Sequence, residues 1–495
     1  MRISRLCLIL VALPMVVACF SDRSTEATRQ LSHITIESGI DSVYNIDKND
    51  TLFIEPVITQ SNKEKPLSYT WEIDLKPISH DRTFTYVGNA LGKYNCRLVV
   101  ENEDGKSFFP FLLYVNSPYE EGITLLSRDT QGNSMLSFMQ ESYSGEKPSF
   151  TAGDCFAVNN PDVQFAAGAA DIVQCSGSLI IACQGGGERD DLPTIYYLNE
   201  KTLVVENMFT VPEYDDFRPT ILGVTSSGHS GSAYPIVCEN GSVYELSTTE
   251  AVIAKPRMLQ STYAQSCIVN NGSYPDILLW DKENNALAQI HNNYGPYFCS
   301  TEYMLELADP LFNSKNYFNG REFIAMAKIN MTIKQSAEND QEFLILSRIA
   351  NTPMAICEKM YTYLWLDEET GLRLLNSSRG VVEESPLKAE TPCVANMTYK
   401  SLLFADGNKV RRWYYETNVS QLPVAPVLLT VGSDSAVITA FEISADHLKT
   451  YVAFYEPNVE GLNGSVWVFD TDTGDVLEKY ENICYKPVKM FYKAR

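Results

Sequence analysis

Basic side chains are scarce in this sequence. Its 495 residues include 39 Lys and Arg against 62 Asp and Glu, which gives a formal net charge of −23 at pH 7. Proteins that bind nucleic acids draw most of their affinity from clustered Lys and Arg. Because an acidic surface of this kind repels a phosphate backbone, we expect no nucleic-acid partner.

Motifs for metals and disulfides are also missing. The five histidines form no spaced set, and the 12 cysteines include no Cys-x-x-Cys pair. Most cysteines lie within apolar runs such as Ile181-Ala182-Cys183, where a thiol behaves as a small hydrophobic side chain. The sequence therefore predicts no disulfide framework and no cofactor. It offers no metal-ligand spacing, and whether distant residues converge on a metal stays open.

Long hydrophobic runs are limited to the first residues. An apolar stretch of about 12 residues follows Arg2 and Arg5, from Leu6 to Val17, and it is too short to cross a bilayer, which takes about 20. The stretch closes with Val16-Val17-Ala18-Cys19. A basic start, a short apolar stretch and small residues before a cysteine are typical of a bacterial lipoprotein signal.

This signal predicts a lipid-anchored protein. We expect residues 1–18 to be removed, Cys19 to carry acyl chains, and residues 19–30 to form a polar tether. Each buried methylene contributes about 0.8 kcal/mol, so several chains hold a protein to a membrane almost permanently. The alternative is an ordinary secreted protein in which the cysteine lies near the cleavage site by chance.

Short alternating β patterns occupy residues 31–117. Two segments, Tyr69-Thr70-Trp71-Glu72-Ile73 and 92–105, are typical of strands separated by turns. Alternation in the second segment places four side chains on one face, where Trp71 can cover them. These four are Tyr94, Cys96, Leu98 and Val100. The pattern predicts a small β-sandwich.

The same two strands resemble a PKD-like (polycystic-kidney-disease-type) immunoglobulin-like domain. The Tyr-x-Trp strand and the Gly-x-Tyr-x-x-x-Leu-x-Val-x-Asn-x-x-Gly strand and turn match the most recognisable segments of that family. The order of leader, lipid cysteine, this domain, segment 119–127 and a large β domain resembles the PKD-like lipoproteins of Bacteroidetes. In that family a Trp often stands where this chain has Ile123.

This resemblance implies a location and partners. PKD-like lipoproteins of this kind accompany Sus-type outer-membrane uptake systems, in which a transporter barrel and its lid lipoprotein import glycans or peptides. The resemblance thus implies an outer-membrane lipoprotein that faces the cell surface. An inward orientation stays open, because Asp22 and Glu26 make a thinner acidic stretch after Cys19 than surface export usually shows.

Hairpin patterns recur through residues 118–495. A strand, a turn rich in Asp, Asn, Thr or Gly, and a second strand return at intervals of about 33 to 70 residues, which is typical of a β-propeller. In Asp470-Thr471-Asp472-Thr473-Gly474 the first Asp caps a type I turn and the Gly accepts a positive φ. We expect an all-β fold with seven blades if the first and last hairpins share a closing blade, and eight otherwise. Stacked β-sandwiches are the main competitor.

Three motifs that resemble functional sites are better explained as turns or loops. Gly228-His229-Ser230-Gly231 lacks the glycine spacing and the following helix of a nucleophile elbow. Gly185-Gly186-Gly187 precedes acidic residues where a phosphate-binding loop requires Lys. The Asp470 turn has its glycine and its acid in the reverse order of an EF-hand loop. We assign no catalytic and no metal-binding residue.

Three loops carry aromatic side chains beside polar ones. They cover residues 213–219, 292–298 and 316–321. Flat rings stack on sugar faces or on peptide side chains, while Asp, Asn and Arg supply directed hydrogen bonds. The predicted ligand-binding residues are Tyr214, Asp215, Asp216, Phe217, Arg218, Tyr294, Tyr297, Tyr317 and Arg321. The alternative for each is packing in the seams between blades.

These observations favour a non-catalytic binding or accessory lipoprotein that takes a glycan or a peptide. A polysaccharide-degrading propeller enzyme, such as a glycosidase or lyase, is a second class, and its paired carboxylates would come from different strands. A surface adhesin or structural protein is a third. The sequence does not identify which glycan or peptide is the ligand.

Overall fold

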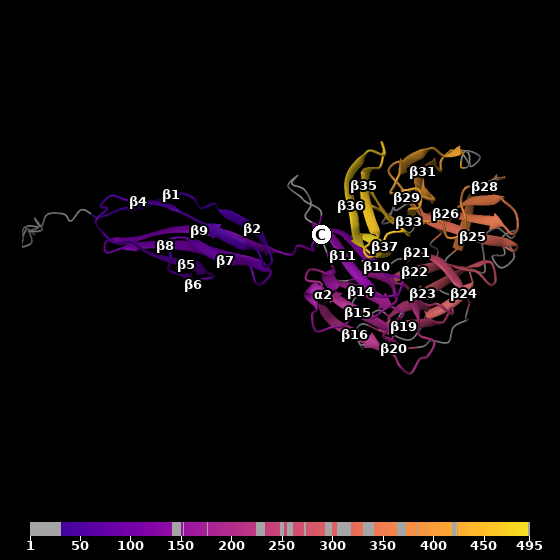
Figure 1. The fold of residues 1–495 in the computed structure, drawn as a ribbon, viewed down its shortest axis with the longest axis horizontal. Helices are drawn as coiled ribbons and strands as arrows, with labels where there is room; N and C mark the ends of the chain where they lie inside the picture. The colour runs from indigo at the N-terminus through magenta and orange to yellow at the C-terminus, as the bar shows by residue number, and fades with distance from the viewer. Residues whose placement is uncertain are drawn as a thin grey trace, which may run out of the picture. The chain divides into compact units, whose positions relative to one another are not determined.

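The computed structural model describes residues 31–493, apart from 141–149, 152, 176, 224–232, 248–251, 255–260, 272–273, 293–298, 304–317, 330–340, 364–372, 384, 418–421 and 423. Almost all of the regular structure consists of β-strands (Figure 1). The α-helix α2 (Cys155–Asn159) begins at Asp154, whose side chain accepts hydrogen bonds from two amides of the first turn. None of the helices in the described part is long and apolar enough to cross a membrane.

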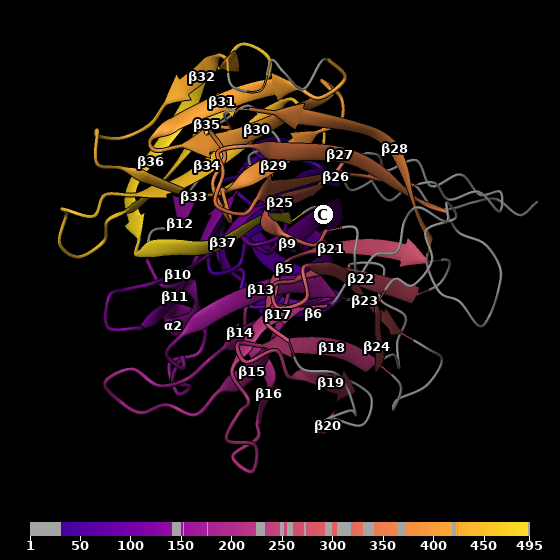
Figure 2. The ribbon, with the colours of Figure 1, turned by 90° about the vertical axis from the view of Figure 1, so that its right-hand side faces the viewer.

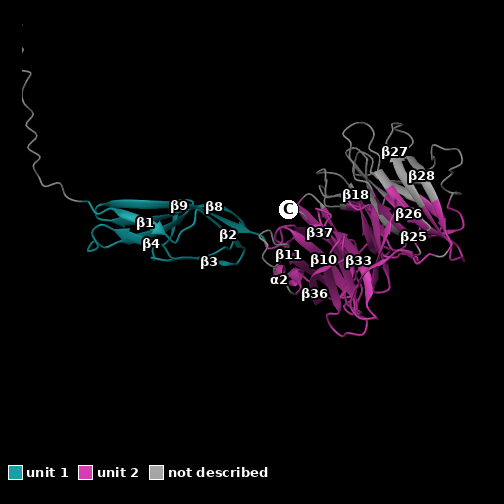
Figure 3. Ribbon diagram, turned by 90° about the horizontal axis from the view of Figure 1, so that it is seen from above, with its two compact units in different colours: residues 1–117 teal, residues 118–495 magenta. Residues whose placement is uncertain are grey.

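The chain divides into two compact units, residues 1–117 and 118–495 (Figure 3). The strands of unit 1 are β1 (Ile34–Ser38), β2 (Val43–Asp47), β3 (Thr51–Ile54), β4 (Val57–Gln60), β5 (Ser68–Ile73), β6 (Lys76–Ser79), β7 (Phe84–Val87), β8 (Gly92–Asn102) and β9 (Gly105–Asn116). They form a five-stranded sheet in the order β2-β9-β8-β5-β6 and two pairs, β1–β4 and β3–β7. Unit 1 is therefore a β-sandwich.

Trp71 is the centre of the core of unit 1. Its side chain is fully buried, its ring stacks on Phe84 with centroids 4.8 Å apart, and its Nε1 donates to the main-chain oxygen of Asp81 at 3.0 Å. On β8, Cys96, Leu98 and Val100 are buried as the alternation predicts, and Tyr94 packs at the edge of the same cluster. Burying an aromatic ring of this kind contributes about 3 kcal/mol.

Unit 2 consists of seven four-stranded antiparallel sheets in the described residues. Their strands are β10 (Gly122–Arg128), β11 (Ser134–Gln140), β12 (Phe150–Thr151), β13 (Ala169–Cys175), β14 (Ser178–Cys183), β15 (Thr194–Asn199), β16 (Val205–Thr210), β17 (Pro219–Leu222), β18 (Ala233–Cys238), β19 (Val243–Ser247), β20 (Val252–Ala254), β21 (Tyr263–Asn271), β22 (Tyr274–Asp281), β23 (Ala286–Asn292), β24 (Cys299–Tyr303), β25 (Arg321–Lys328), β26 (Gln341–Ile349), β27 (Ala355–Tyr363), β28 (Arg373–Val382), β29 (Cys393–Asn396), β30 (Ser401–Asp406), β31 (Lys409–Tyr414), β32 (Val427–Thr430), β33 (Val437–Ile443), β34 (Lys449–Tyr455), β35 (Gly464–Asp470), β36 (Val476–Cys484) and β37 (Lys486–Lys493).

Six of these sheets are consecutive meanders, from β13–β16 to β33–β36, and the seventh has the order β12-β11-β10-β37. The first strand of each meander and β37 form a set of inner strands, which lie toward the middle of unit 2 in Figure 2. β13 lies next to β17 and β37, and β33 lies next to β29 and β37. Unit 2 is thus a seven-bladed β-propeller, closed by one blade that combines the first and last strands, as the seven-blade prediction required.

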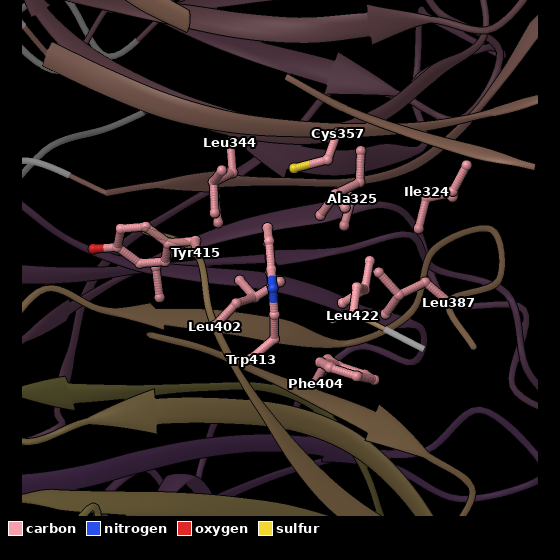
Figure 4. Close-up of a cluster of buried hydrophobic side chains, with 14 of the residues drawn as sticks. Ile324, Ala325, Leu344, Cys357, Leu387, Leu402, Phe404, Trp413, Tyr415 and Leu422 are labelled. Carbon is pink, nitrogen blue, oxygen red and sulfur yellow. The ribbon is translucent and has the colours of Figure 1, made fainter. Parts of the chain in front are cut away.

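Apolar clusters join neighbouring blades. One cluster contains Phe404 and Trp413 from the β29–β32 blade together with Ile324 and Leu344 from the β25–β28 blade (Figure 4). Corresponding clusters join the β13–β16 blade to its neighbours on both sides. Because a single blade has two apolar faces, it buries them only by packing against the next blade.

The same irregularity recurs near the start of six inner strands. One extra residue is inserted relative to the second strand of the blade, or relative to β10 in the closing blade. The extra residues are Ala170, Thr220, Gln265, Ile324, Thr439 and Val488. A bulge of this kind bends the strand and changes the direction of the side chains that follow it.

Several cysteines in the described part of the chain are free thiols. Cys96, Cys155, Cys183 and Cys484 are buried, and Cys393 is partly buried. Burial raises the pKa of the Cys183 thiol to about 12, so this group stays protonated and behaves as a small apolar side chain.

The turn at Asp470 also has the predicted geometry. Its carboxylate accepts hydrogen bonds from the amides of Asp472 and Thr473, and Gly474 has a φ of 80°. These amide bonds lower the pKa of Asp470. The carboxylate therefore stabilises its own turn.

Candidate functional site

The antiparallel meander divides the turns of unit 2 between two faces. The inner strands begin at one face, which we call the start face, and end at the other, which we call the end face. The connection from one blade to the next inner strand and the turn between the second and third strands lie on the start face. The other two turns of each blade lie on the end face.

The loop between β16 and β17 lies on the start face and contains five of the predicted ligand-binding residues. Phe217 is 1% exposed, and its ring packs edge-on against Tyr244 with centroids 5.0 Å apart. Tyr214 is partly buried, and its ring lies 5.2 Å from that of Tyr244. These two aromatic side chains therefore anchor the loop to its own blade.

Asp216 fastens the same loop to the β18–β19 turn. Its carboxylate accepts hydrogen bonds from the hydroxyl of Tyr244, from Oγ of Ser242 at 3.1 Å and from Nδ2 of Asn240 at 3.5 Å. Burial, together with the neighbouring Asp216 carboxylate, raises the pKa of Tyr244, so its hydroxyl remains a donor. The main-chain oxygen of Arg218 accepts from the amide of Glu239 at 2.9 Å.

Of the five predicted residues in this loop, Asp215 and Arg218 are exposed. They stand on either side of the two anchored residues. The loop thus presents a carboxylate and a guanidinium from a backbone that its neighbours hold in place. Loops of this kind on a β scaffold are common positions for recognition.

The other four predicted ligand-binding residues do not belong to the β16–β17 loop. Arg321 begins β25 on the start face, is 7% exposed, and holds its guanidinium over the ring of Phe318 at 5.3 Å. Cys19, Tyr294, Tyr297 and Tyr317 lie outside the described residues. β23 ends and β24 begins on the end face, opposite to the face that holds Asp215 and Arg218.

The glycine run 185–187 belongs to the β14–β15 turn on the start face. The amide of Gly185 donates to Ala167, and Gly186 exchanges hydrogen bonds with Asp191. Asp191 also pairs with Arg189 at 2.7 Å. The amides of Gly185 and Gly186 are therefore already used in hydrogen bonds, and the nearby carboxylate of Asp191 would repel a phosphate.

Three charged side chains on inner strands were not found from the sequence. Lys489 on β37 forms an ion pair with Asp171 on β13, whose side chain is 5% exposed. The second oxygen of Asp171 accepts from the amide of Leu222 on β17 at 2.8 Å. Burial raises the pKa of Glu442 on β33 to about 7, although the amide of Tyr492 and the charge of Lys489 act in the opposite direction.

These three residues link four neighbouring inner strands. Lys489 lies between the carboxyl groups of Asp171 and Glu442. Each carboxylate also accepts a hydrogen bond from a backbone amide of a neighbouring inner strand, Asp171 from Leu222 and Glu442 from Tyr492. A carboxyl group with a pKa near 7 can take up or release a proton at physiological pH. The only sequence signal was a single charge inside an otherwise apolar strand, as in Phe441-Glu442-Ile443.

Replacing Asp216 by Ala is expected to destabilise unit 2 by about 1–3 kcal/mol, because the buried hydroxyl of Tyr244 loses its acceptor. Urea unfolding would measure the loss, and hydrogen exchange in 211–218 should become faster. Asp215→Ala, one residue away and exposed, is the matched control and should change stability by less than about 0.5 kcal/mol. Equal effects of the two variants would contradict the anchoring role.

Unit 2 belongs to the structural class of seven-bladed β-propellers. No protein-family model and no curated protein matches the chain. A quinonprotein alcohol dehydrogenase-like protein from Bacteroides thetaiotaomicron is 15% identical, with a TM-score of 0.48 over 93% of this chain and 99% of that one. A second protein of unknown function from the same organism is 8% identical, with a TM-score of 0.32 over 94% of each chain.

A dihydro-heme d1 dehydrogenase is 8% identical, with a TM-score of 0.39 over 80% of this chain and 72% of the other. Similarities at this level do not transfer an activity, because one fold hosts many unrelated functions.

Proposed function

We propose that this chain is a lipid-anchored outer-membrane protein whose propeller binds a glycan or peptide without transforming it, as an accessory component of a Sus-type uptake system. The observation that carries the binding part is the loop between β16 and β17. Its exposed Asp215 and Arg218 flank the anchored Asp216 and Phe217.

The anchoring favours recognition for an energetic reason. A loop that must become ordered on binding loses affinity, whereas a loop already held by its own contacts avoids most of that cost. A carboxylate accepts hydrogen bonds from sugar hydroxyls or peptide amides, and a guanidinium donates several in a fixed plane. Together, Asp215 and Arg218 suit a polar ligand with both donors and acceptors.

The lipid anchor proposed at Cys19 supports the accessory role. Acyl chains on Cys19 would confine the protein to the membrane plane, where a transporter and its lid lipoprotein are at high effective concentration. A weak contact is then sufficient for association. In this proposal the PKD-like unit 1 is the spacer and docking unit, unit 2 presents the ligand site, and the protein faces the cell surface.

Arrays of glycans and peptides probed with residues 20–495 test the binding part. We expect at least one ligand class to bind, and Asp215→Ala and Arg218→Ala each to weaken binding about tenfold, as loss of a hydrogen bond to a charged group does. Glu460→Ala is the matched control, because Glu460 is exposed on the start face of another blade. Binding that survives both loop variants would contradict this site.

Membrane preparations test the anchor separately. Mass spectrometry should find acyl chains on Cys19, and the transporter should copurify with the parent chain but not with a Cys19→Ser variant. Protease treatment of intact cells should remove the protein if it faces outward. An unmodified Cys19 or copurification without any transporter would overturn this part and leave the ligand site untouched.

Glu442 favours a second candidate function, that of a polysaccharide-degrading enzyme. Its pKa of about 7 suits a general acid or base near neutral pH. Turnover of a bound polysaccharide that disappears in Glu442→Gln, with ligand affinity retained, would replace the non-catalytic proposal by this one.

A further inference from the structure

Within the described residues, several buried polar atoms without a hydrogen-bond partner lie at one seam between two blades of the propeller. They are Nε and Nη2 of Arg412, Oγ of Ser401 and Nδ1 of His447. Arg412 and Ser401 belong to the β29–β32 blade, and His447 belongs to the first turn of the β33–β36 blade. All three residues lie toward the end face, opposite to the loop with Asp215 and Arg218.

Contacts within the described residues bring these side chains together. Ser401 on β30 pairs in register with Tyr414 on β31, and alternation places Arg412 on the same face as Tyr414. The main-chain oxygen of His447 accepts from Nδ2 of Asn396 at 2.9 Å. Asn396 is the register partner of Ser401. Arg412, Ser401 and His447 therefore form one cluster, with Tyr414 and Asn396 beside them.

Only one nitrogen of the Arg412 guanidinium donates hydrogen bonds to described residues. Nη1 donates to the hydroxyl of Tyr414 at 3.1 Å and to the main-chain oxygen of Asp472 at 2.8 Å. Nε and Nη2 lie on the other edge and have no acceptor among the described residues, although the side chain is only 5% exposed. A buried cationic donor without an acceptor is strongly unfavourable.

The charge of Arg412 helps to lower the pKa of Asp470, but no described carboxylate accepts a hydrogen bond from Nε or Nη2. Oδ1 of Asp472 is 3.7 Å from Nη1, and its side chain is 60% exposed, so this pair is weak. The carboxylate of Asp470 accepts from the amides of its own turn. Nε and Nη2 are therefore left as two parallel donors, the geometry that matches two oxygens of a carboxylate or phosphate.

The cluster lies one side chain below the surface. Tyr414 is 42% exposed and covers the guanidinium, with its ring centroid 5.7 Å from Cζ of Arg412. Tyr414 is therefore the exposed side chain that lies over the buried guanidinium. We infer that this seam is a binding site for an oxyanion, a carboxylate or phosphate group, held by Nε and Nη2 of Arg412 and by Oγ of Ser401.

Titration of residues 20–495 with sodium phosphate or with sodium acetate, against sodium chloride at equal ionic strength, tests this site. Each oxyanion that binds should raise the melting temperature saturably, and calorimetry should give one site per chain. Arg412→Met should abolish the response, and Ser401→Ala should weaken the affinity about tenfold. Lys409→Met, which removes an exposed positive charge from the same strand, should respond like the parent.

The two titrations separate the sources of the oxyanion. A response to acetate assigns the site to carboxylates such as those of acidic sugars or peptide ends, and a response to phosphate alone assigns it to phosphorylated ligands. If Arg412→Met fails to fold, Ser401→Ala carries the test. No response beyond chloride, a response unchanged in Ser401→Ala, or a crystal structure in saturating phosphate with only water at Nε and Nη2 would overturn the site.

Discussion

Ending the chain after Tyr485, which removes β37, is expected to abolish the cooperative folding of unit 2. β37 is the inner strand of the closing blade and pairs along the whole of β10. It also supplies Met490, which is 3% exposed, and the ion pair of Lys489 with Asp171. Without it, β10–β12 lose their inner neighbour, and the last blade no longer meets the first.

The end of β37 strengthens this expectation. Lys493 is 1% exposed, and its Nζ donates to the main-chain oxygens of Tyr119 and Glu200, which fastens the closing blade to the next one. We expect a loss larger than the roughly 5–15 kcal/mol that stabilises a typical domain. Calorimetry should show that the transition of unit 2 disappears.

Unit 1 is the internal reference for this truncation. Its core around Trp71 contains only residues of unit 1, so its transition should persist. Lys486→Ala, which changes an exposed side chain of β37, should leave both transitions within about 0.5 kcal/mol of the parent. A truncated chain that kept both transitions would show that the propeller does not depend on its closing strand.

The closing strand also shows what the sequence could and could not predict. Each hairpin is a local pattern, and the turn at Asp470 forms as its residues require. The pairing of β10 with β37 joins segments at opposite ends of unit 2. The choice between seven and eight blades depended on that pairing, which no local pattern encodes. The inner-strand bulges at Thr220 and Thr439 were likewise invisible, because a bulge depends on the partner strand.

The candidate site was predictable to a smaller extent. The sequence selected segment 213–219, but it could not tell which side chains face the blade. Phe217 and Asp216 are anchors, and Asp215 and Arg218 are exposed. Asp171 and Glu442 were visible in the sequence only as single charges inside apolar strands. Their interactions with Lys489 could not be predicted, because they cross from blade to blade. Arg412 was hidden for the same reason, since its unsatisfied edge is defined by a seam between blades.

Replacing Glu245 by Gln is expected to stabilise unit 2 by about 3 kcal/mol above pH 8 and to have little effect near pH 4. Glu245 lies on β19 and is 2% exposed, and its Oε1 has no hydrogen-bond partner in the part of the chain that the structure describes. Burial raises its pKa from 4.5 to about 7. Between these values the folded state keeps a proton that the unfolded state has released, so the parent loses stability as the pH rises.

Gln resembles the protonated carboxyl group and cannot ionise, so the variant lacks this loss. Urea unfolding of both chains from pH 4 to pH 8 measures the difference. Glu442 has a raised pKa in both chains, and its contribution cancels when the two curves are subtracted. Glu239→Gln, at an exposed position in the same blade, is the control and should follow the parent. A difference between Glu245→Gln and the parent that stays constant with pH would mean that Glu245 is not a buried, titrating carboxyl group in the folded state.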